Sequence, residues 1–143
     1  MTPFQIVVDT NVLVAALRSK KGASYKLLSL IDAKIFQLNI SVPLILEYED
    51  VIKRDLEISS SLNEAEIDNI LDYICAVANK HKIFFLWRPF LHDPKDDFIL
   101  ELAVEAQCKY IVTYNKADFT GIESFGLKAL TPKEFLQLIG EIP

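Results

Sequence analysis

Two hydrophobic patterns alternate along the chain. Short apolar runs are typical of strands, and the run at 5–8 is also rich in β-branched residues, as in a strand of a parallel sheet that is covered on both faces. Such runs occur at residues 5–8, 36–40, 83–86, 110–113 and 127–130. Between them, apolar residues recur at the spacing of one helix face, as at Ile67, Ile70, Leu71 and Ile74. The alternation predicts an α/β domain with a mostly parallel sheet of about five short strands.

Capping residues mark where several helices begin. Asn63, with Glu66 three positions later, resembles a capping box, and Thr131 with Glu134 forms another that has a proline at its first helical position. We expect the polar run KHK at 80–82 to end the helix that Asn63 begins, because positive charge is favourable near a helix C-terminus.

Length and composition fit one domain that spans residues 1–143, because a chain of this length with 51% hydrophobic residues can bury one sizeable core. No apolar run approaches the ~20 residues of a membrane span, and no signal-peptide pattern follows Met1. We therefore expect a cytoplasmic protein with no membrane partner. Cys75, Cys108, His81 and His92 lack the spacing of metal ligands, so we expect structural or solvent-facing roles for them.

The net charge of −5 argues against a protein that holds nucleic acid on a broad basic surface, since that mode depends on many lysine and arginine contacts to phosphate. An acidic protein can still act on a phosphodiester if bound cations invert the charge at its site. The position of the carboxylates is therefore the main question.

The stretch FQIVVDTNVLVAAL at residues 4–17 places polar residues directly after a buried strand. Asp9 follows that strand, and ligands of open α/β sheets bind in the crevice outside the carboxyl ends of the strands. Asp9, with Asn11 beside it, is therefore a candidate for a functional site. A simpler alternative is that Asp9 or Thr10 only caps the helix that follows.

Glu47 lies in a predicted helix that starts near Ser41 and carries the sequence PLILEYEDVIKRDL. Its neighbours on the helix face are apolar, so its carboxylate lies beside the buried stripe rather than squarely in solvent. The alternative is an ordinary surface glutamate that pairs with Lys53 or Arg54.

A second acidic stretch, DPKDDFILELAVEAQCKYIVTYNKADF at 93–119, contains the start of a helix and the end of a later strand. Asp93 is a good N-cap before Pro94, and Asp96 and Asp97 follow in the first turn. The helix dipole favours acids there, but one cap does not require three of them. If the later strand is parallel to the first, the polar residues that follow it open on the same edge as Asp9: Thr113, Asn115 and Asp118.

The order and spacing of these residues resemble the PIN domain. The resemblance covers nearly all of the chain, through VVDTNVLVAAL, ILEYEDVI, DPKDDFILELA, IVTYNKADF and LTPKEFL. It is greatest to the bacterial and archaeal toxins of the VapC kind. The resemblance implies a three-layer α/β/α fold and an Mg²⁺- or Mn²⁺-dependent endoribonuclease that hydrolyses phosphodiester bonds of RNA. It also implies a homodimer and a cognate antitoxin protein that holds the toxin inactive.

Roles carry over to this chain residue by residue. The resemblance assigns catalysis to Asp9, Glu47, Asp96 and Asp118, and the orientation of substrate or water to Asn11, Thr113 and Asn115. Metal binding falls to Asp9, Asp96 and Glu47, with Asp97 and Asp118 as further candidates. Hard ions such as Mg²⁺ keep several waters, so a few acids at a sheet edge can hold one without a closed cage.

Two departures from the family pattern affect these roles. Many relatives carry an aspartate where Asn115 stands, so a second metal site would be weaker or absent. Asp97 beside Asp96 also makes the third acidic position ambiguous by one residue. We prefer Asp96, because it lies seven residues before Ala103, as in the family pattern.

Two other functions compete with the nuclease. A catalytically silent PIN-fold module that binds protein or RNA would be favoured by the loss of a central acid, but Asp9, Glu47 and Asp96 are all present. A receiver-like phosphoryl acceptor would also place an aspartate after a buried strand. Lys116 is available for that role, but the early pair of acids is missing.

Overall fold

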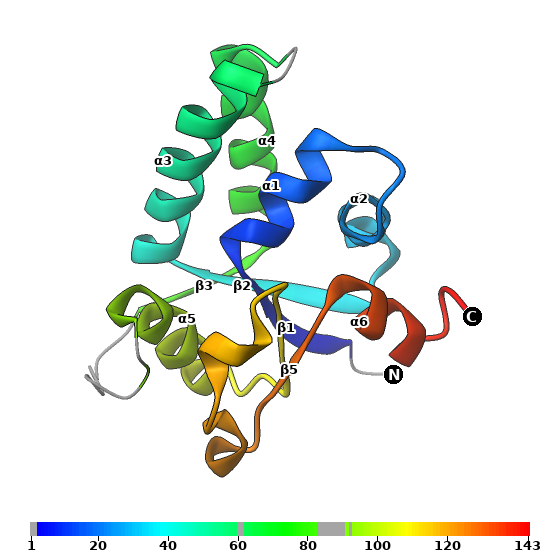
Figure 1. The fold of residues 1–143 in the computed structure, drawn as a ribbon, viewed down its shortest axis with the longest axis vertical. Helices are drawn as coiled ribbons and strands as arrows, with labels where there is room; N and C mark the ends of the chain where they lie inside the picture. Colours follow the sequence, from blue (N-terminus) through cyan, green and yellow to red (C-terminus); the bar gives the residue numbers. More distant parts are fainter. Residues whose placement is uncertain (1–2, 60–61, 83–90, 92) are drawn as a thin grey trace.

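The central feature of the fold is a sheet of five parallel strands. The structure, a computed structural model, describes residues 3–59, 62–82, 91 and 93–143 (Figure 1). The strands lie in the order β3-β2-β1-β4-β5. Their bounds are Phe4–Val8 for β1, Phe36–Ser41 for β2, Asn79–His81 for β3, Tyr110–Val112 for β4 and Lys128–Leu130 for β5. Every pairing between neighbouring strands in the described residues is parallel.

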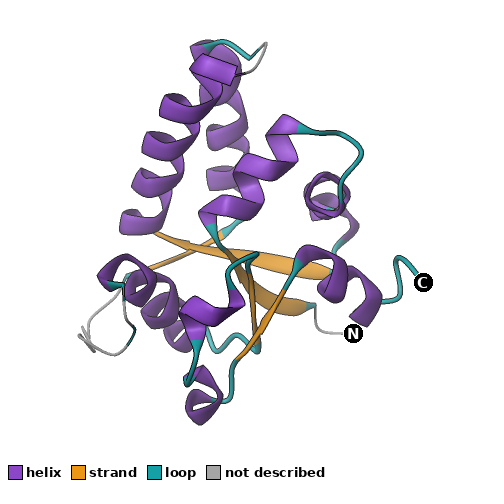
Figure 2. Cartoon of the chain, viewed as in Figure 1, coloured by secondary structure: helices purple, strands orange, loops and turns teal. Residues whose placement is uncertain are grey.

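Helices cover both faces of this sheet. The α-helices are α1 (Thr10–Arg18), α2 (Ala23–Ser29), α3 (Val42–Ser59), α4 (Glu64–Val77), α5 (Pro94–Glu105) and α6 (Pro132–Leu138). The described residues also contain three short 3₁₀ turns: η1 (Ile31–Ala33) lies between α2 and β2, and η2 (Lys116–Phe119) and η3 (Ile122–Phe125) lie between β4 and β5. Figure 1 shows α1 to α4 on one side of the sheet and α5 on the other, and Figure 2 shows the same layers by element type. The predicted three-layer α/β/α fold is therefore confirmed.

Both predicted capping boxes are present. Asn63 and Glu66 bond to each other's backbone N–H groups at the start of α4, and Thr131 and Glu134 do the same at the start of α6. None of the described helices is long and apolar enough to cross a membrane.

The expected end of the α4 helix at 80–82 is wrong. α4 ends at Val77, and Asn79–His81 forms strand β3 beside β2, in the register Asn39↔Asn79. The buried Asn39 side chain accepts a hydrogen bond from Nε2 of His81 at 2.8 Å, which ties the two strands together. Pairing with a distant strand thus decides a stretch whose own polar composition gives no strand pattern. The predicted strand at 83–86 and His92 lie outside the described residues.

The order of the strands reverses at one position in the sheet, between β1 and β4. From β1 the chain proceeds to β2 and β3 on one side, and later returns to β4 and β5 on the other side of β1. β1 and β4 are therefore neighbours whose following segments diverge, which is the topological switch point where ligands of open α/β sheets bind. The last residues of these strands pair as Val8↔Val112, so Asp9 and Thr113 emerge side by side.

Candidate active site

A cleft of about 880 Å³ opens at the carboxyl ends of β1 and β4. It is lined by six acids, two arginines, and polar or small apolar side chains. The acids are Asp9, Glu47, Asp55, Asp93, Asp96 and Asp118, and the arginines are Arg18 and Arg54. Such an excess of carboxylates over cations is unfavourable for folding alone and is typical of sites that bind a cation.

Asp9 is held at the floor of the cleft by three hydrogen bonds. Its backbone N–H donates to the carbonyl of Val112 at 2.9 Å, which joins the ends of β1 and β4. Its Oδ1 accepts from the N–H of Thr10 at 2.8 Å, and its Oδ2 accepts from the hydroxyl of Thr113 at 2.7 Å. Asp9 is thus both the N-cap of α1 and a wall of the cleft, so the two interpretations of this residue are compatible.

Burial is the main reason why the pKa of Asp9 lies above its ordinary value of 3.8. The side chain is only 8% exposed, and the nearby charges of Glu47 and Asp118 also raise the pKa. Hydrogen bonds from Thr113 and Thr10 act in the opposite direction and favour the ionised form. A positive ion in the cleft would relieve the same unfavourable interactions.

Glu47 reaches the cleft from the second turn of α3. Its Oε2 accepts a hydrogen bond of 2.5 Å from the hydroxyl of Thr10, which places Thr10 between the two acids Asp9 and Glu47. The two cations suggested as partners of Glu47 bind other carboxylates instead. Lys53 lies 2.8 Å from Asp68, and Arg54 lies 3.2 Å from Asp50.

Tyr48 fixes α3 against the strand that carries Asp9. Its side chain is 3% exposed, and its hydroxyl donates a hydrogen bond to the carbonyl of Val8. Burial, followed by the charges of Asp9 and Glu47, raises the pKa of Tyr48, so the hydroxyl keeps its proton. The contact sets the position of α3, and with it Glu47, relative to the end of β1.

Asp96 and Asp97 point in different directions from the first turn of α5. Asp96 lines the cleft, and burial together with the charges of Asp9, Asp118, Asp93 and Glu47 raises its pKa to about 7. Asp97 is 1% exposed and accepts a hydrogen bond from the N–H of Leu91 at 2.9 Å. Asp97 is not among the residues that line the cleft. Adjacent helix positions diverge by about 100°, so only one of the two acids can face it.

The residues after β4 complete the rim. Thr113 is fully buried, and its hydroxyl oxygen accepts from the N–H of Asn115 at 3.0 Å while it donates to Asp9. Asn115 and Asp118 are exposed and line the cleft. Asn11 also lines it, and its Oδ1 accepts from the N–H of Tyr114 at 3.4 Å. The structure therefore brings seven predicted site residues to one cleft or its support, and leaves Asp97 outside it.

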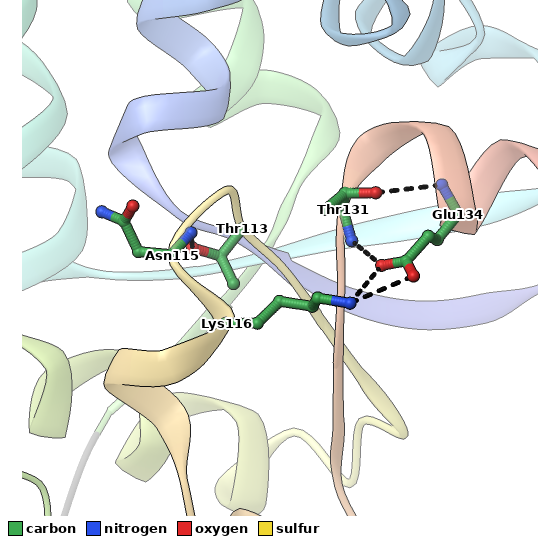
Figure 3. A network of polar contacts seen from close by, with 5 residues as sticks. All are labelled: Thr113, Asn115, Lys116, Thr131 and Glu134. Carbon is green, nitrogen blue, oxygen red and sulfur yellow. Dashed lines mark hydrogen bonds and ion pairs between the residues drawn. The ribbon is translucent and has the colours of Figure 1, made fainter.

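Lys116 is turned away from this cleft (Figure 3). Its Nζ donates to both carboxylate oxygens of Glu134, at 2.9 and 3.0 Å, and the same carboxylate accepts from the N–H of Thr131. Figure 3 shows the amide of Asn115 on the opposite side of the backbone from the Lys116 side chain. Lys116 thus belongs to the cap of α6, which removes the lysine that a receiver-like site would need.

The donor set fits a hard divalent cation that keeps most of its waters. Within the described residues, no three His, Cys, Asp or Glu side chains lie close enough together to hold an ion as a group. A closed cage is therefore absent from this part of the chain, but Mg²⁺ is commonly bound through one or two carboxylates and several waters. The acids of the cleft offer oxygen ligands only, which suits Mg²⁺ and Mn²⁺ better than soft metals.

Sequence reasoning missed the two arginines and the bridging role of Thr10. Arg18 and Thr10 lie eight residues apart on α1, and Arg54 lies seven residues after Glu47 on α3. These spacings place each pair near one helix face, so the signal was present in the helical periodicity. It could not be used without knowing that these two faces oppose each other across a cleft.

Comparisons with known proteins agree with this architecture. A family profile described as "PIN domain" matches residues 5–117. Among solved structures, the chain is similar to one described as "Crystal structure of VapBC2 from Rickettsia felis bound to a DNA fragment from their promoter". The TM-score is 0.61 at 18% identity, and the match covers 90% of this chain and 98% of that chain. At this identity the likeness concerns the fold alone. No curated protein sequence matches the chain.

Proposed function

The chain belongs to the PIN domain family, and on this premise we propose that it is a metal-dependent endoribonuclease that hydrolyses phosphodiester bonds of RNA. The observation that carries the proposal is the acidic cleft at the switch point between β1 and β4, where Asp9, Glu47, Asp96 and Asp118 converge. The raised pKa values of Asp9 and Asp96 support a cation-binding role, because a nearby positive charge would favour the ionised form of both carboxyl groups.

Asp9 and Asp96 would hold Mg²⁺ or Mn²⁺, with Glu47 and Asp118 as supporting acids that bind its water molecules. When bound, such an ion supplies positive charge that activates a water molecule and stabilises the charge on the reacting phosphate. The four acids come from four separate segments of the chain, and a bound cation would offset their repulsion of a substrate phosphate.

The neighbouring side chains position these acids. Thr113 donates to Asp9, and Thr10 donates to Glu47, so each hydroxyl holds one carboxylate in one orientation. Asn11 and Asn115 present uncharged amides at the rim, where they would orient a phosphate or a water without adding repulsion.

We propose further that the protein is the toxin of a toxin–antitoxin pair and acts in the cytoplasm. The similarity in fold to a structure described as VapBC2 supports a cognate antitoxin as partner. We also propose a homodimer, since Val42 and Leu46 on α3 are 67% and 58% exposed and present an apolar surface. Light scattering at tens of micromolar checks this, because a particle of 16.2 kDa would be a monomer.

Cleavage of RNA tests the central proposal. Purified protein incubated with mixed RNAs should cleave them in Mg²⁺ or Mn²⁺ and stop on addition of EDTA. Asp9→Asn should abolish the activity, whereas Asp72→Asn, the same chemical change at an exposed position of α4, should not. Circular dichroism of both variants should match that of the parent. Cleavage that survives EDTA, or none with any divalent ion, would favour the catalytically silent module instead.

A further inference from the structure

The cleft extends well beyond the acids that we assign to catalysis. It continues between α1 and α3, which pack against each other and rise from the sheet side by side (Figure 1). α1 contributes Asn11, Val14, Ala15 and Arg18 to this part, and α3 contributes Glu47, Val51, Arg54 and Asp55. At 1.5 Å per residue, Arg18 lies about 12 Å along α1 from Thr10. The cleft therefore has an acidic end at the sheet and an arginine end farther out.

The two arginines at the outer end of the cleft form exposed ion pairs, which a ligand could replace. Arg18 and Arg54 are the only cations among the described residues that line the cleft. Nη2 of Arg18 lies 2.5 Å from Oδ2 of Asp55, so this pair crosses from α1 to α3, while Arg54 pairs with Asp50 on its own helix. Exposed ion pairs contribute little to stability, so a phosphate could replace either carboxylate at small cost.

We propose that Arg18 and Arg54 bind the backbone phosphates of single-stranded RNA on one side of the bond that lies at the acidic end. The inference rests on the proposed nuclease function and adds the path of its substrate. The guanidinium group suits the role, because its planar fork binds phosphate through two parallel hydrogen bonds. Asp55 restrains Arg18 across the cleft until the RNA takes its place.

The size and lining of the cleft define the class of substrate. A volume of about 880 Å³ is that of a small-ligand pocket, which has room for a few nucleotides of one strand. No aromatic side chain is among the described lining residues, so bases have no stacking platform there. Contacts in this part of the cleft should therefore hold the phosphate backbone and contribute little to sequence selection.

RNA affinity and its salt dependence test the role of the arginines. The assay is fluorescence anisotropy of a short labelled single-stranded RNA, in an Asp96→Asn background that prevents turnover. Arg18→Ala and Arg54→Ala should each weaken binding about tenfold, the scale of one charge-assisted contact. Each should also make the slope of log affinity against log salt shallower by about 0.7, as for one lost phosphate contact on a single strand. Lys128→Ala, a charge removed from β5 outside the cleft, should change neither.

Asp55→Asn tests whether the Arg18–Asp55 pair restrains an arginine that binds RNA or only holds α1 and α3 together. If the Arg18–Asp55 pair only holds the helices together, Asp55→Asn and Arg18→Ala will weaken RNA binding alike. If Asp55 restrains an arginine that binds RNA, Asp55→Asn will tighten binding. That gain should be smaller when Arg18→Ala is also present, which a double-mutant cycle measures.

The result that overturns the proposal is equal RNA affinity in Arg18→Ala, Arg54→Ala and Lys128→Ala, or weaker binding in Asp55→Asn. The nuclease itself is measured separately, as Mn²⁺-dependent hydrolysis of bis(p-nitrophenyl) phosphate by the unmodified chain. If the chain hydrolyses this small diester but its RNA binding does not depend on the arginines, the proposed RNA path is refuted and the proposed nuclease activity is not. Arginine-dependent RNA binding without any hydrolysis would support the path and refute the nuclease.

Discussion

Two polar clusters lie at the carboxyl ends of neighbouring strands, and they are opposite in their charge balance. The cluster at the start of α6 joins Lys116, Glu134 and Thr131, and every charge in it has an opposite partner (Figure 3). The pKa of Glu134 is lowered, first by the hydrogen bond from Thr131 and then by that from Lys116. The acidic cluster around Asp9 and Asp96 has raised pKa values instead, from burial and mutual repulsion.

The contrast separates a structural use of polar residues from a functional one. A compensated cluster stabilises the fold in which it is seen, as the capping box of α6 does. A cluster of like charges costs stability unless a cation binds among them, which is the role that we propose for the acidic cluster. We therefore expect substitutions in the acidic cluster to lower activity, and Asp96→Asn also to raise stability, whereas substitutions in the cluster at α6 should lower stability and leave activity unchanged.

The largest expected effect is the loss of activity in Asp9→Asn, compared with Glu134→Gln. Asp9→Asn should lower metal-dependent RNA cleavage at least about a hundredfold, the scale of losing one preorganised electrostatic group. Its fold should remain, because asparagine is also a good N-cap for α1. Glu134→Gln should cleave RNA like the parent. Initial rates at saturating Mg²⁺ measure both, and equal losses in the two variants would remove the distinction between the clusters.

Thr113→Val tests whether the support of Asp9 contributes to catalysis. The valine cannot donate the 2.7 Å hydrogen bond to Asp9, so the carboxylate loses its orientation and part of its negative charge stabilisation. We expect kcat to fall about tenfold to a hundredfold, as for residues that orient a metal ligand. Thr120→Val is the control, since the Thr120 hydroxyl is exposed and donates only to the carbonyl of Ala117. A parent-like kcat in Thr113→Val would contradict this role.

Asp96→Asn should raise the melting temperature in EDTA and weaken the stabilisation by added Mg²⁺ or Mn²⁺. The folded-state pKa of about 7 lies above the ordinary 3.8, so ionised Asp96 destabilises the fold increasingly as pH rises through this interval. The gain in melting temperature should therefore be larger at about pH 8 than at about pH 5.

Asp97→Ala is the matched contrast to Asp96→Asn. It removes the acceptor of the Leu91 N–H, so we expect a loss of about 1–3 kcal/mol in the free energy of unfolding with the metal response retained. Thermal unfolding across a metal titration measures both variants. If Asp96→Asn melts lower in EDTA and keeps its full metal response, Asp96 is a structural cap and its assignment is wrong.

The smallest effects are expected in the compensated cluster. Thr131→Ala should cost about 0.5–2 kcal/mol through loss of the α6 cap. Lys116→Ala should cost about 0–1 kcal/mol, because the pair with Glu134 is half exposed. The folded-state pKa of Glu134 lies below its ordinary value of 4.5, so its contribution is present above that pH and lost as the pH falls through the lowered value. Urea unfolding at neutral and acid pH measures this, and a larger Lys116→Ala effect in acid would contradict it.

Much of the fold could be predicted because its signals are local. The short apolar stretches of β1, β2 and β4 and the capping boxes at Asn63 and Thr131 are visible in short windows of sequence. β3 was not predictable, since Asn79–His81 is polar and becomes a strand only through its pairing with β2. A three-residue segment that forms a strand only through pairing with a distant strand has no strand pattern in its own sequence.

The parts of the candidate site that follow from strand order could be predicted from the sequence. The parts that depend on how a helix is rotated about its axis could not. Parallel strands bring Asp9 and Thr113 to one edge whatever their side-chain conformations. The choice between Asp96 and Asp97 depends on how α5 is rotated about its axis, which packing of the whole helix decides. The same holds for Arg18 and Arg54, whose helix faces became recognisable as cleft walls only in three dimensions.

The hydrogen bond from Tyr48 to the carbonyl of Val8 has a consequence for the energetics of ion binding. In a flexible backbone, two carboxylates that repel each other move apart, and a cation that binds both must bring them together again at a cost in free energy. Here the buried Tyr48 fixes α3 to the end of β1, while Thr10 contacts both Asp9 and Glu47. These contacts should limit how far the backbone can move to relieve the repulsion between the two acids. If the proposed cation binds here, little reorganisation should accompany binding, and its affinity should depend mainly on charge and dehydration.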